Sequence, residues 1–145
     1  MIMQDYITKD EVRKVCASLK IRDWTKLKEG RVLASEAKKI LSKVNIEKMN
    51  IDLEEFRVGL EVELEHGMRF KDANVTNNHP IVTGMIVLAH LKESLDYYKL
   101  LEVAELQGDL IKAIKQGNTA KIKNYYKRLA NAWIALHKAE LKTLR

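Results

Sequence analysis

The chain has few of the residues that interrupt helices or crosslink small folds. Its 145 residues include one proline, six glycines and one cysteine, whereas 46% of them are hydrophobic. A single cysteine excludes an internal disulfide framework and favours a reducing compartment. The high hydrophobic content excludes a disordered chain, and the length suffices for one domain with a substantial core.

Long apolar runs are also missing. The longest, over residues 81–91, is too short to cross a bilayer and is interrupted by Thr83, Gly84 and His90. No basic stretch followed by an apolar one opens the chain, so no secretion signal is expected. These absences predict a soluble, cytoplasmic protein that does not use a membrane.

Sequence motifs of common enzymes are missing too. The chain has no P-loop, dinucleotide-binding fingerprint, H-E-x-x-H motif or paired-cysteine zinc pattern. Cys16 has no neighbour that would activate it as a nucleophile, and we interpret it as a small core residue. The sequence therefore favours a protein that is not an enzyme, without deciding the question.

What the chain does contain is helical periodicity, with no strand-like alternation and no hairpin turn between strands. We predict an all-α fold, a compact bundle of five to seven helices with a basic helical extension at the C-terminus. Thr8 and Glu11 form a capping box that opens the first helix. Gly67 and Gly108 mark expected helix ends. Further helices are expected over residues 30–44, 52–66, 81–93, 97–107, 109–116 and from 119 onward.

The last helix carries a heptad-like row of side chains. Its members alternate by four and three residues: Ile122, Tyr126, Leu129, Trp133, Leu136 and Glu140. Such a seam is typical of a helix that packs along another helix. We expect it to lie against the rest of the protein or against a second copy of the chain, which would make a homo-oligomer.

Positive charge is concentrated in the same part of the chain. The net charge is +6, and residues 109–145 hold nine Lys and Arg against two acids, a balance of +7 that leaves −1 for the rest. We expect an anionic partner, nucleic acid or an acidic protein; a solvated helix face without a partner is the alternative. The residues that resemble a phosphate-contacting face with a stacking aromatic are Lys121, Lys123, Tyr125, Lys127 and Arg128.

Two short motifs place a histidine and a glutamate three residues apart. They are Glu63-x-x-His66 and His90-x-x-Glu93, and residues at this spacing share one face of a helix. If the two helices pack together, these four side chains could hold one Fe or Zn ion. Helical di-iron sites use similar pairs, but the second motif has the reverse order and the carboxylate set is incomplete.

A buried polar network is the alternative interpretation of the same four residues. His90 lies on an apolar helix, where a hydrogen bond to Glu63 or Tyr97 would satisfy it and fix the register of the helices. His79 and Tyr97 could otherwise join a metal site as further ligands or as partners of the ligands. Both interpretations require the two helices to be neighbours.

The motifs around these pairs occur together in a known family. They are Glu61 to Gly67 (EVELEHG), Asn74 to Asn77 (NVTN), His90 to Glu93 (HLKE) and Asp96 to Tyr98 (DYY). Over about residues 5–107 the chain resembles a family of small uncharacterised bacterial and phage proteins, a domain of unknown function. The resemblance implies a family-like core over 1–108 and an origin in a phage or mobile element. The basic segment over 109–145 lies outside the resemblance, and we expect it to pack on the core or on a partner.

The chain departs from that family in two places. Residues 25–50 look inserted where similar proteins run directly into the Glu-rich helix. Leu95 stands where the family commonly has proline before Asp-Tyr-Tyr, so the bend after the helix over 81–93 is expected to be softer. The family carries no established activity that could be transferred to this chain.

These observations favour a small helical binding module that engages an anionic partner through its basic C-terminal helices. Two alternatives stay open. One is a helical protein with a His/Glu site for Fe or Zn. The other is a self-associating structural or virion-type protein that uses the C-terminal seam.

Overall fold

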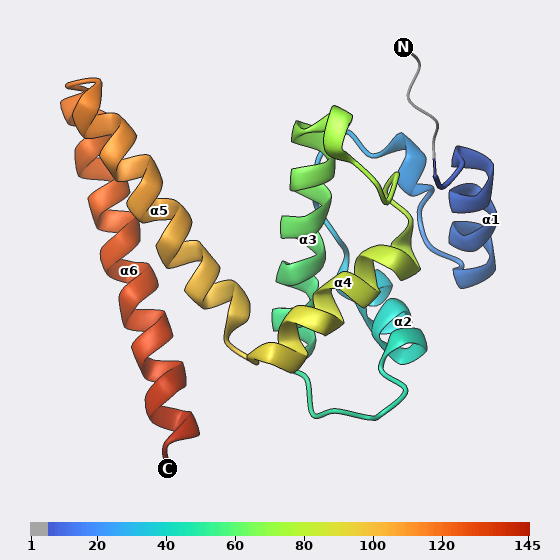
Figure 1. Ribbon diagram of the computed structural model, residues 1–145. Coiled ribbons are helices and arrows are strands. Elements are labelled where there is room, and N and C mark those ends of the chain that lie inside the picture. Colours follow the sequence, from blue (N-terminus) through green and yellow to red (C-terminus); the bar gives the residue numbers. More distant parts are fainter. Residues whose placement is uncertain (1–5) are drawn as a thin grey trace. The chain divides into compact units, whose positions relative to one another are not determined.

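The computed structural model describes residues 6–145, which form six α-helices, two short 3₁₀-helices and no strand (Figure 1). This confirms the predicted all-α fold. The elements in chain order are α1 (Lys9–Leu19), η1 (Trp24–Lys26), α2 (Ala34–Val44), α3 (Leu53–Arg69), η2 (Lys71–Ala73), α4 (Pro80–Glu93), α5 (Tyr97–Lys115) and α6 (Thr119–Thr143). Contacts within the chain define two compact units, the first ending at Glu93 and the second comprising Ser94–Arg145. No helix in the described part is long and apolar enough to cross a membrane.

The first unit packs α1, α2 and α3 against α4 (Figure 1). α4 begins at Pro80, whose missing N–H is harmless in the first turn of a helix. Its buried residues include Thr83, Val87 and Leu91, and nearly all the others are apolar. Because α4 is apolar on almost every side, three helices can cover it at once.

The predicted capping box at the start of α1 is confirmed. The hydroxyl of Thr8 accepts a hydrogen bond from the N–H of Glu11 (3.2 Å), and the N–H of Thr8 donates to the Glu11 carboxylate (2.8 Å). Further along α1, Cys16 is buried and its sulfur accepts the N–H of Trp24 at 3.5 Å. Burial raises the pKa of the Cys16 thiol, which fits a core residue rather than a nucleophile.

Residues 25–50, expected as an insertion relative to the family, belong to the core of this chain. They supply the buried side chains Val32, Ala37, Ile40 and Val44, and α2 packs against α3 and α4. The helices approach so closely that a Cβ atom on Gly84 of α4 would lie 2.5 Å from Cγ2 of Ile40. Only glycine permits this spacing.

Two predicted helix boundaries are wrong because tertiary contacts override the local signal. α2 begins at Ala34 rather than at residue 30, since residues 30–33 run along α3 outside the helix. α3 continues past Gly67 to Arg69. Gly67 marks a contact and not a helix end, because a Cβ atom there would lie 2.9 Å from the carboxamide carbon of Asn74.

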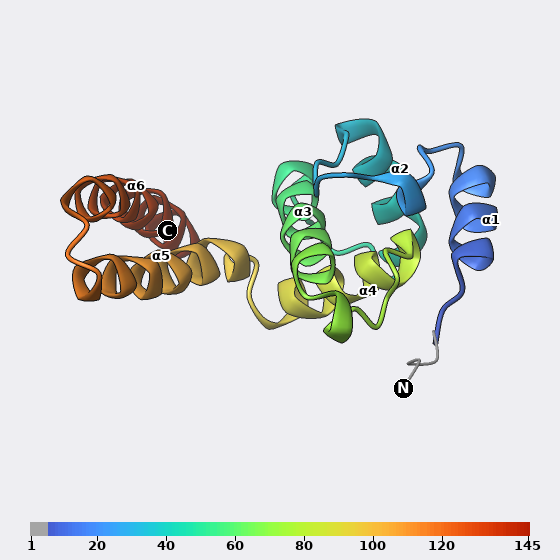
Figure 2. The ribbon, with the colours of Figure 1, turned by 90° about the horizontal axis from the view of Figure 1, so that it is seen from above.

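The second unit is an antiparallel pair of helices, α5 and α6, which lie side by side in Figures 1 and 2. We call this unit the hairpin. Gly117, with φ of 63°, forms the turn between the helices. The side chain of Asn118 accepts the N–H of Lys121 at 3.0 Å and so caps α6.

The predicted helix end at Gly108, and with it a separate helix over 109–116, is wrong. α5 runs without interruption from Tyr97 to Lys115. A glycine inside a helix costs about 1 kcal/mol relative to alanine, which packing along a second helix readily outweighs. The compact units consequently divide between Glu93 and Ser94, whereas the sequence-based division lay at residue 108 within a helix.

The seam of α6 is rotated from its predicted position. The buried cluster of the hairpin consists of Val103, Leu106, Leu129, Ala132 and Leu136, with Leu110 and Tyr125 packed against it. Tyr126 and Trp133, which were predicted on the seam, are 62% and 36% exposed. The predicted row mixed members of two neighbouring apolar stripes on α6, of which only one faces α5.

Candidate functional site

The Glu63–His90 pair joins α3 to α4. Oε1 of Glu63 lies 3.6 Å from Nε2 of His90, and the two side chains are 17% and 31% exposed. The helices are therefore neighbours, as both interpretations of the motifs required. At this distance the contact is an ion pair when His90 is protonated, and it is longer than a hydrogen bond.

The other two residues of the predicted metal site lie in more open surroundings. His66 on α3 and Glu93 at the end of α4 are both exposed. Within residues 6–145, no three His, Cys, Asp or Glu side chains are grouped so that they could hold a metal ion. The structure thus brings two of the four predicted ligands together, and the metal site stays a prediction.

His79, considered as a further ligand, is engaged at the start of α4. Its Nδ1 accepts hydrogen bonds from the N–H groups of Ile81 (3.2 Å) and Val82 (3.3 Å). These are the contacts that a serine or aspartate cap usually makes. Burial lowers the pKa of His79 despite the opposing effect of Glu11, so the neutral ring that can accept hydrogen bonds is favoured.

The acidic edge of α3 holds the segment that precedes α2. The carboxylate of Glu61 accepts the N–H of Val32 at 3.0 Å, and the guanidinium of Arg57 donates to the Val32 carbonyl at 3.3 Å. Arg57 also pairs with Glu54 and Glu61. The hydrogen bond to Glu54 and the charge of Glu61 raise the pKa of Arg57. Glu61, part of the family-like motif, therefore serves the fold.

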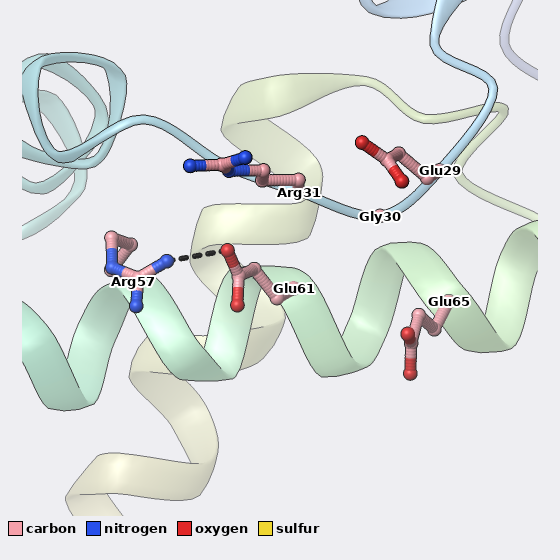
Figure 3. A pocket seen from close by; sticks show the side chains of 6 residues that line it. All are labelled: Glu29, Gly30, Arg31, Arg57, Glu61 and Glu65. Carbon is pink, nitrogen blue, oxygen red and sulfur yellow. Dashed lines mark hydrogen bonds and ion pairs between the residues drawn. The ribbon is translucent and has the colours of Figure 1, made fainter.

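An open pocket of about 410 Å³ lies beside this segment (Figure 3). Its lining residues are Glu29, Gly30, Arg31, Arg57, Glu61 and Glu65. Figure 3 shows Arg57 and Glu61 turned towards each other and paired. Acidic and basic side chains both line the pocket, and Arg57 and Glu61 already bind each other. The pocket therefore does not present charge of one sign to a ligand. No sequence motif marked Glu29 or Arg31.

An ion pair that sequence reasoning missed joins the half-exposed Arg22, in the loop after α1, to α2. Glu36 is 2% exposed, and its carboxylate accepts hydrogen bonds from the Arg22 guanidinium at 2.7 and 2.9 Å. The N–H groups of Arg22 and Leu33 also donate to it. Burial alone would raise the pKa of Glu36, but these hydrogen bonds outweigh it and lower the pKa. Arg22 and Glu36 therefore bind other groups of the chain itself.

The NVTN motif closes the loop between α3 and α4. The Asn74 side chain accepts the N–H of Asn77 at 3.0 Å and donates to the Asn78 side chain at 3.1 Å. The Asn77 side chain donates to the Ile7 carbonyl at 2.9 Å. Asn77 and Asn78 both have positive φ, which asparagine tolerates better than most residues. The motif therefore organises the backbone.

The five predicted anion-binding residues do not share one narrow face of α6. At 100° per residue, Lys121, Lys127 and Arg128 span an arc of about 120°, and Lys123 lies about 40° beyond Lys127. Tyr125 is half-buried against the hairpin core, and the guanidinium carbon of Arg128 lies 5.7 Å from the centre of its ring. Arg128 thus covers a ring that was predicted to stack on a base, and the stacking role stays a prediction.

The fold and these sites define an all-α protein with a four-helix unit, whose polar motif residues mostly hold the chain together, and a basic helical hairpin. The chain belongs to the family described as protein of unknown function (DUF5661), whose sequence profile matches residues 12–107. This confirms the resemblance to a domain-of-unknown-function family. No curated protein and no solved structure matches the chain. The matched region ends within α5, so α6 lies outside it.

Proposed function

We propose that the protein is a helical binding module, not an enzyme, that engages an anionic partner through one side of α6. The observation that supports this is the charge of the helix. α6 has six Lys and Arg residues and a single acid, Glu140. Five of the six share one exposed side, which we call the basic side: Lys121, Lys127, Arg128, Lys138 and Lys142.

The composition of the basic side favours nucleic acid as the partner. No acidic residue lies among its members, and the polar residues between them are Asn124 and Asn131. Lys and Arg neutralise phosphates and release counterions, and asparagine can donate to phosphate oxygens. An acidic protein is the second partner class that such a surface can attract.

Fluorescence anisotropy with a labelled DNA duplex, repeated over a range of salt concentrations, tests this proposal. We expect affinity to fall steeply with salt. Replacement of Lys121, Lys127 and Arg128 by Gln should reduce the slope of log K against log salt by about 2.7, or 0.9 for each lost phosphate contact. Polyglutamate in the same assay separates an acidic protein partner from nucleic acid.

A matched control comes from the first unit. Lys14, Lys38 and Lys43 are exposed on α1 and α2, and their replacement by Gln removes the same charge. This variant should keep the salt dependence of the wild type. Affinity that is indifferent to salt, or an equal loss in both triple variants, rejects the basic side of α6 as the binding surface.

A His/Glu metal site is the second candidate, supported by the 3.6 Å contact between Glu63 and His90. With His66 and Glu93 they would supply nitrogen and oxygen ligands suited to Fe or Zn. Elemental analysis of the purified protein, with His90→Ala as control, tests it. Metal-free protein whose melting temperature is unchanged by a chelator rejects this candidate.

An origin in a phage or other mobile element, with the cytoplasm as the site of action, belongs to the same proposal. It rests on the family resemblance and on the expectation of a nucleic-acid partner. Copurification of nucleic acid with the protein from its natural host would support it. A partner found only outside the cell would count against it.

A further inference from the structure

Each helix of the hairpin carries a second stripe of side chains, displaced by one residue from the stripe that faces its partner helix. The inner stripes are Lys99, Val103, Leu106, Leu110 and Ala113 on α5, and Ile122, Tyr125, Leu129, Ala132 and Leu136 on α6. The outer stripes are Leu100, Ala104, Gln107, Ile111 and Ile114 on α5, and Lys123, Tyr126, Ala130, Trp133, His137 and Glu140 on α6. All four follow the alternating spacing of four and three residues that helix pairs use.

The two outer stripes lie on the same face of the hairpin. One residue turns an α-helix by 100°, so each outer stripe is about a quarter turn from its inner stripe. A two-fold axis perpendicular to the plane of the two helix axes exchanges the helices of an antiparallel pair. A side chain on one face of the pair stays on that face after this rotation. The same turn on both helices therefore leads to one face, whose large apolar side chains are between 36% and 66% exposed: Leu100, Ile111, Ile114, Tyr126 and Trp133.

We propose that this face binds the same face of a second copy of the chain, in antiparallel orientation, so that two hairpins form a four-helix bundle. The outer stripe of α6 is complementary to the same stripe on the α6 helix of an antiparallel second copy. The residues that then lie opposite each other are Lys123 and Glu140, Tyr126 and His137, and Ala130 and Trp133. Opposite charges meet at both ends and a small residue meets the largest one near the axis, as a two-fold interface requires.

The burial within one hairpin also favours a second copy. The cluster between α5 and α6 contains five buried residues, whereas helices of a stable bundle bury a broader apolar face than one seam. Nucleic acid bound to the basic side would leave Tyr126 and Trp133 uncovered. The basic side, with Lys121 and Arg128, points away from the outer stripes. Its charges therefore stay outside the interface, which reduces the repulsion between the two copies.

Sedimentation velocity of the nuclease-treated full chain over a dilution series tests the proposal. We expect a dimer that dissociates on dilution. Lys123→Glu and Glu140→Lys should each raise the dissociation constant by about tenfold or more, because each creates two like-charge contacts per dimer. The double variant should restore the wild-type value, because it reverses both charges of the pair. Lys142→Glu, the same charge change on the basic side, should leave dimerisation unchanged.

Trp133→Glu provides a test by bulk and polarity, and it should abolish the dimer. Circular dichroism shows whether this variant keeps its helices. A monomer at every concentration, a dimer insensitive to both single reversals, or a double variant as weak as the single ones overturns the proposal. The DNA-binding assay distinguishes failure of this proposal from failure of the proposed function. Monomeric protein that binds DNA overturns the dimer alone. A dimer that does not bind DNA overturns the nucleic-acid proposal alone.

Discussion

The two compact units use their polar side chains in opposite ways. In the first unit the buried Glu36, the half-buried Glu61 and the loop residue Asn74 all bind the chain itself. In the hairpin, α6 presents its basic residues and part of its apolar surface to solvent. Residues that recur in a motif can therefore serve packing alone, while the surface that we propose for a partner lies in a region without a motif.

The largest expected effect concerns the buried carboxylate of Glu36 in the first unit. Glu36→Ala removes the acceptor of two backbone N–H groups and of the half-exposed Arg22 guanidinium, which keeps its hydrogen bond to the Arg31 carbonyl. It should destabilise the protein by about 3 kcal/mol. Glu102→Ala on α5 removes an exposed carboxylate and should change stability by less than about 0.5 kcal/mol. Urea unfolding measures both. Equal losses would break the contrast between the units.

The pH dependence of the same pair follows from its pKa. The folded state lowers the pKa of Glu36 below its ordinary value of 4.5, so the unfolded chain binds the proton more readily. The stabilisation is present above that value and is lost as the pH falls through the folded pKa. Urea unfolding between neutral and acidic pH should show a weaker acid dependence for Glu36→Ala than for the wild type.

Glycine substitutions provide the next test. Gly84→Ala would force a methyl group to within 2.5 Å of Ile40 and should cost about 2 kcal/mol, since overpacking exceeds the gain in helix propensity. Gly108→Ala in α5 meets no atom within 4 Å and should stabilise the protein by up to about 1 kcal/mol. Thermal unfolding gives both values, and shifts in the same direction would contradict the account.

The histidine cap of α4 predicts a smaller, pH-dependent effect. Because the folded state lowers the pKa of His79, the unfolded chain binds the proton more readily between the folded pKa and the ordinary value of 6.5. The stabilisation is present above that value and is lost as the pH falls below it. His79→Asn keeps an acceptor and should remove this loss, which urea unfolding at several pH values can measure. An identical pH dependence in both proteins would reject the cap.

The smallest expected effect is a gain in stability. Thr83 is 1% exposed, and no described residue offers its hydroxyl a hydrogen bond. Thr83→Val removes this polar group and should stabilise the protein by up to about 1 kcal/mol. A clear loss of stability on urea unfolding would mean that the hydroxyl has a partner, such as a bound water.

The starts of α1 and α4 were predictable because their signals are local. Thr8 with Glu11, and Pro80, mark the first turns of α1 and α4 through bonds or constraints within four residues. The helix ends predicted at Gly67 and Gly108 are wrong, because neither glycine ends its helix. Gly67 makes room for a side chain of the following loop, and Gly108 lies in a helix whose continuity comes from packing.

The candidate sites divide in the same manner. The spacing of Glu63 and His90 indicated two helical faces, and α3 and α4 do bring them together. Arg22 and Glu36 are 14 residues apart, and no periodicity links a loop residue to a helix face, so this pair could not be predicted. The apolar spacing of α6 indicated a seam, but only the structure separates the stripe that faces α5 from the exposed one.

Amide hydrogen exchange on the full chain, with and without the DNA duplex, tests most directly whether partner binding belongs to the hairpin. We expect slower exchange confined to α5 and α6, because binding stabilises these helices against local opening, with α1 to α4 unchanged. Slower exchange in α3 and α4 around Glu63 and His90, with none in the hairpin, would contradict it.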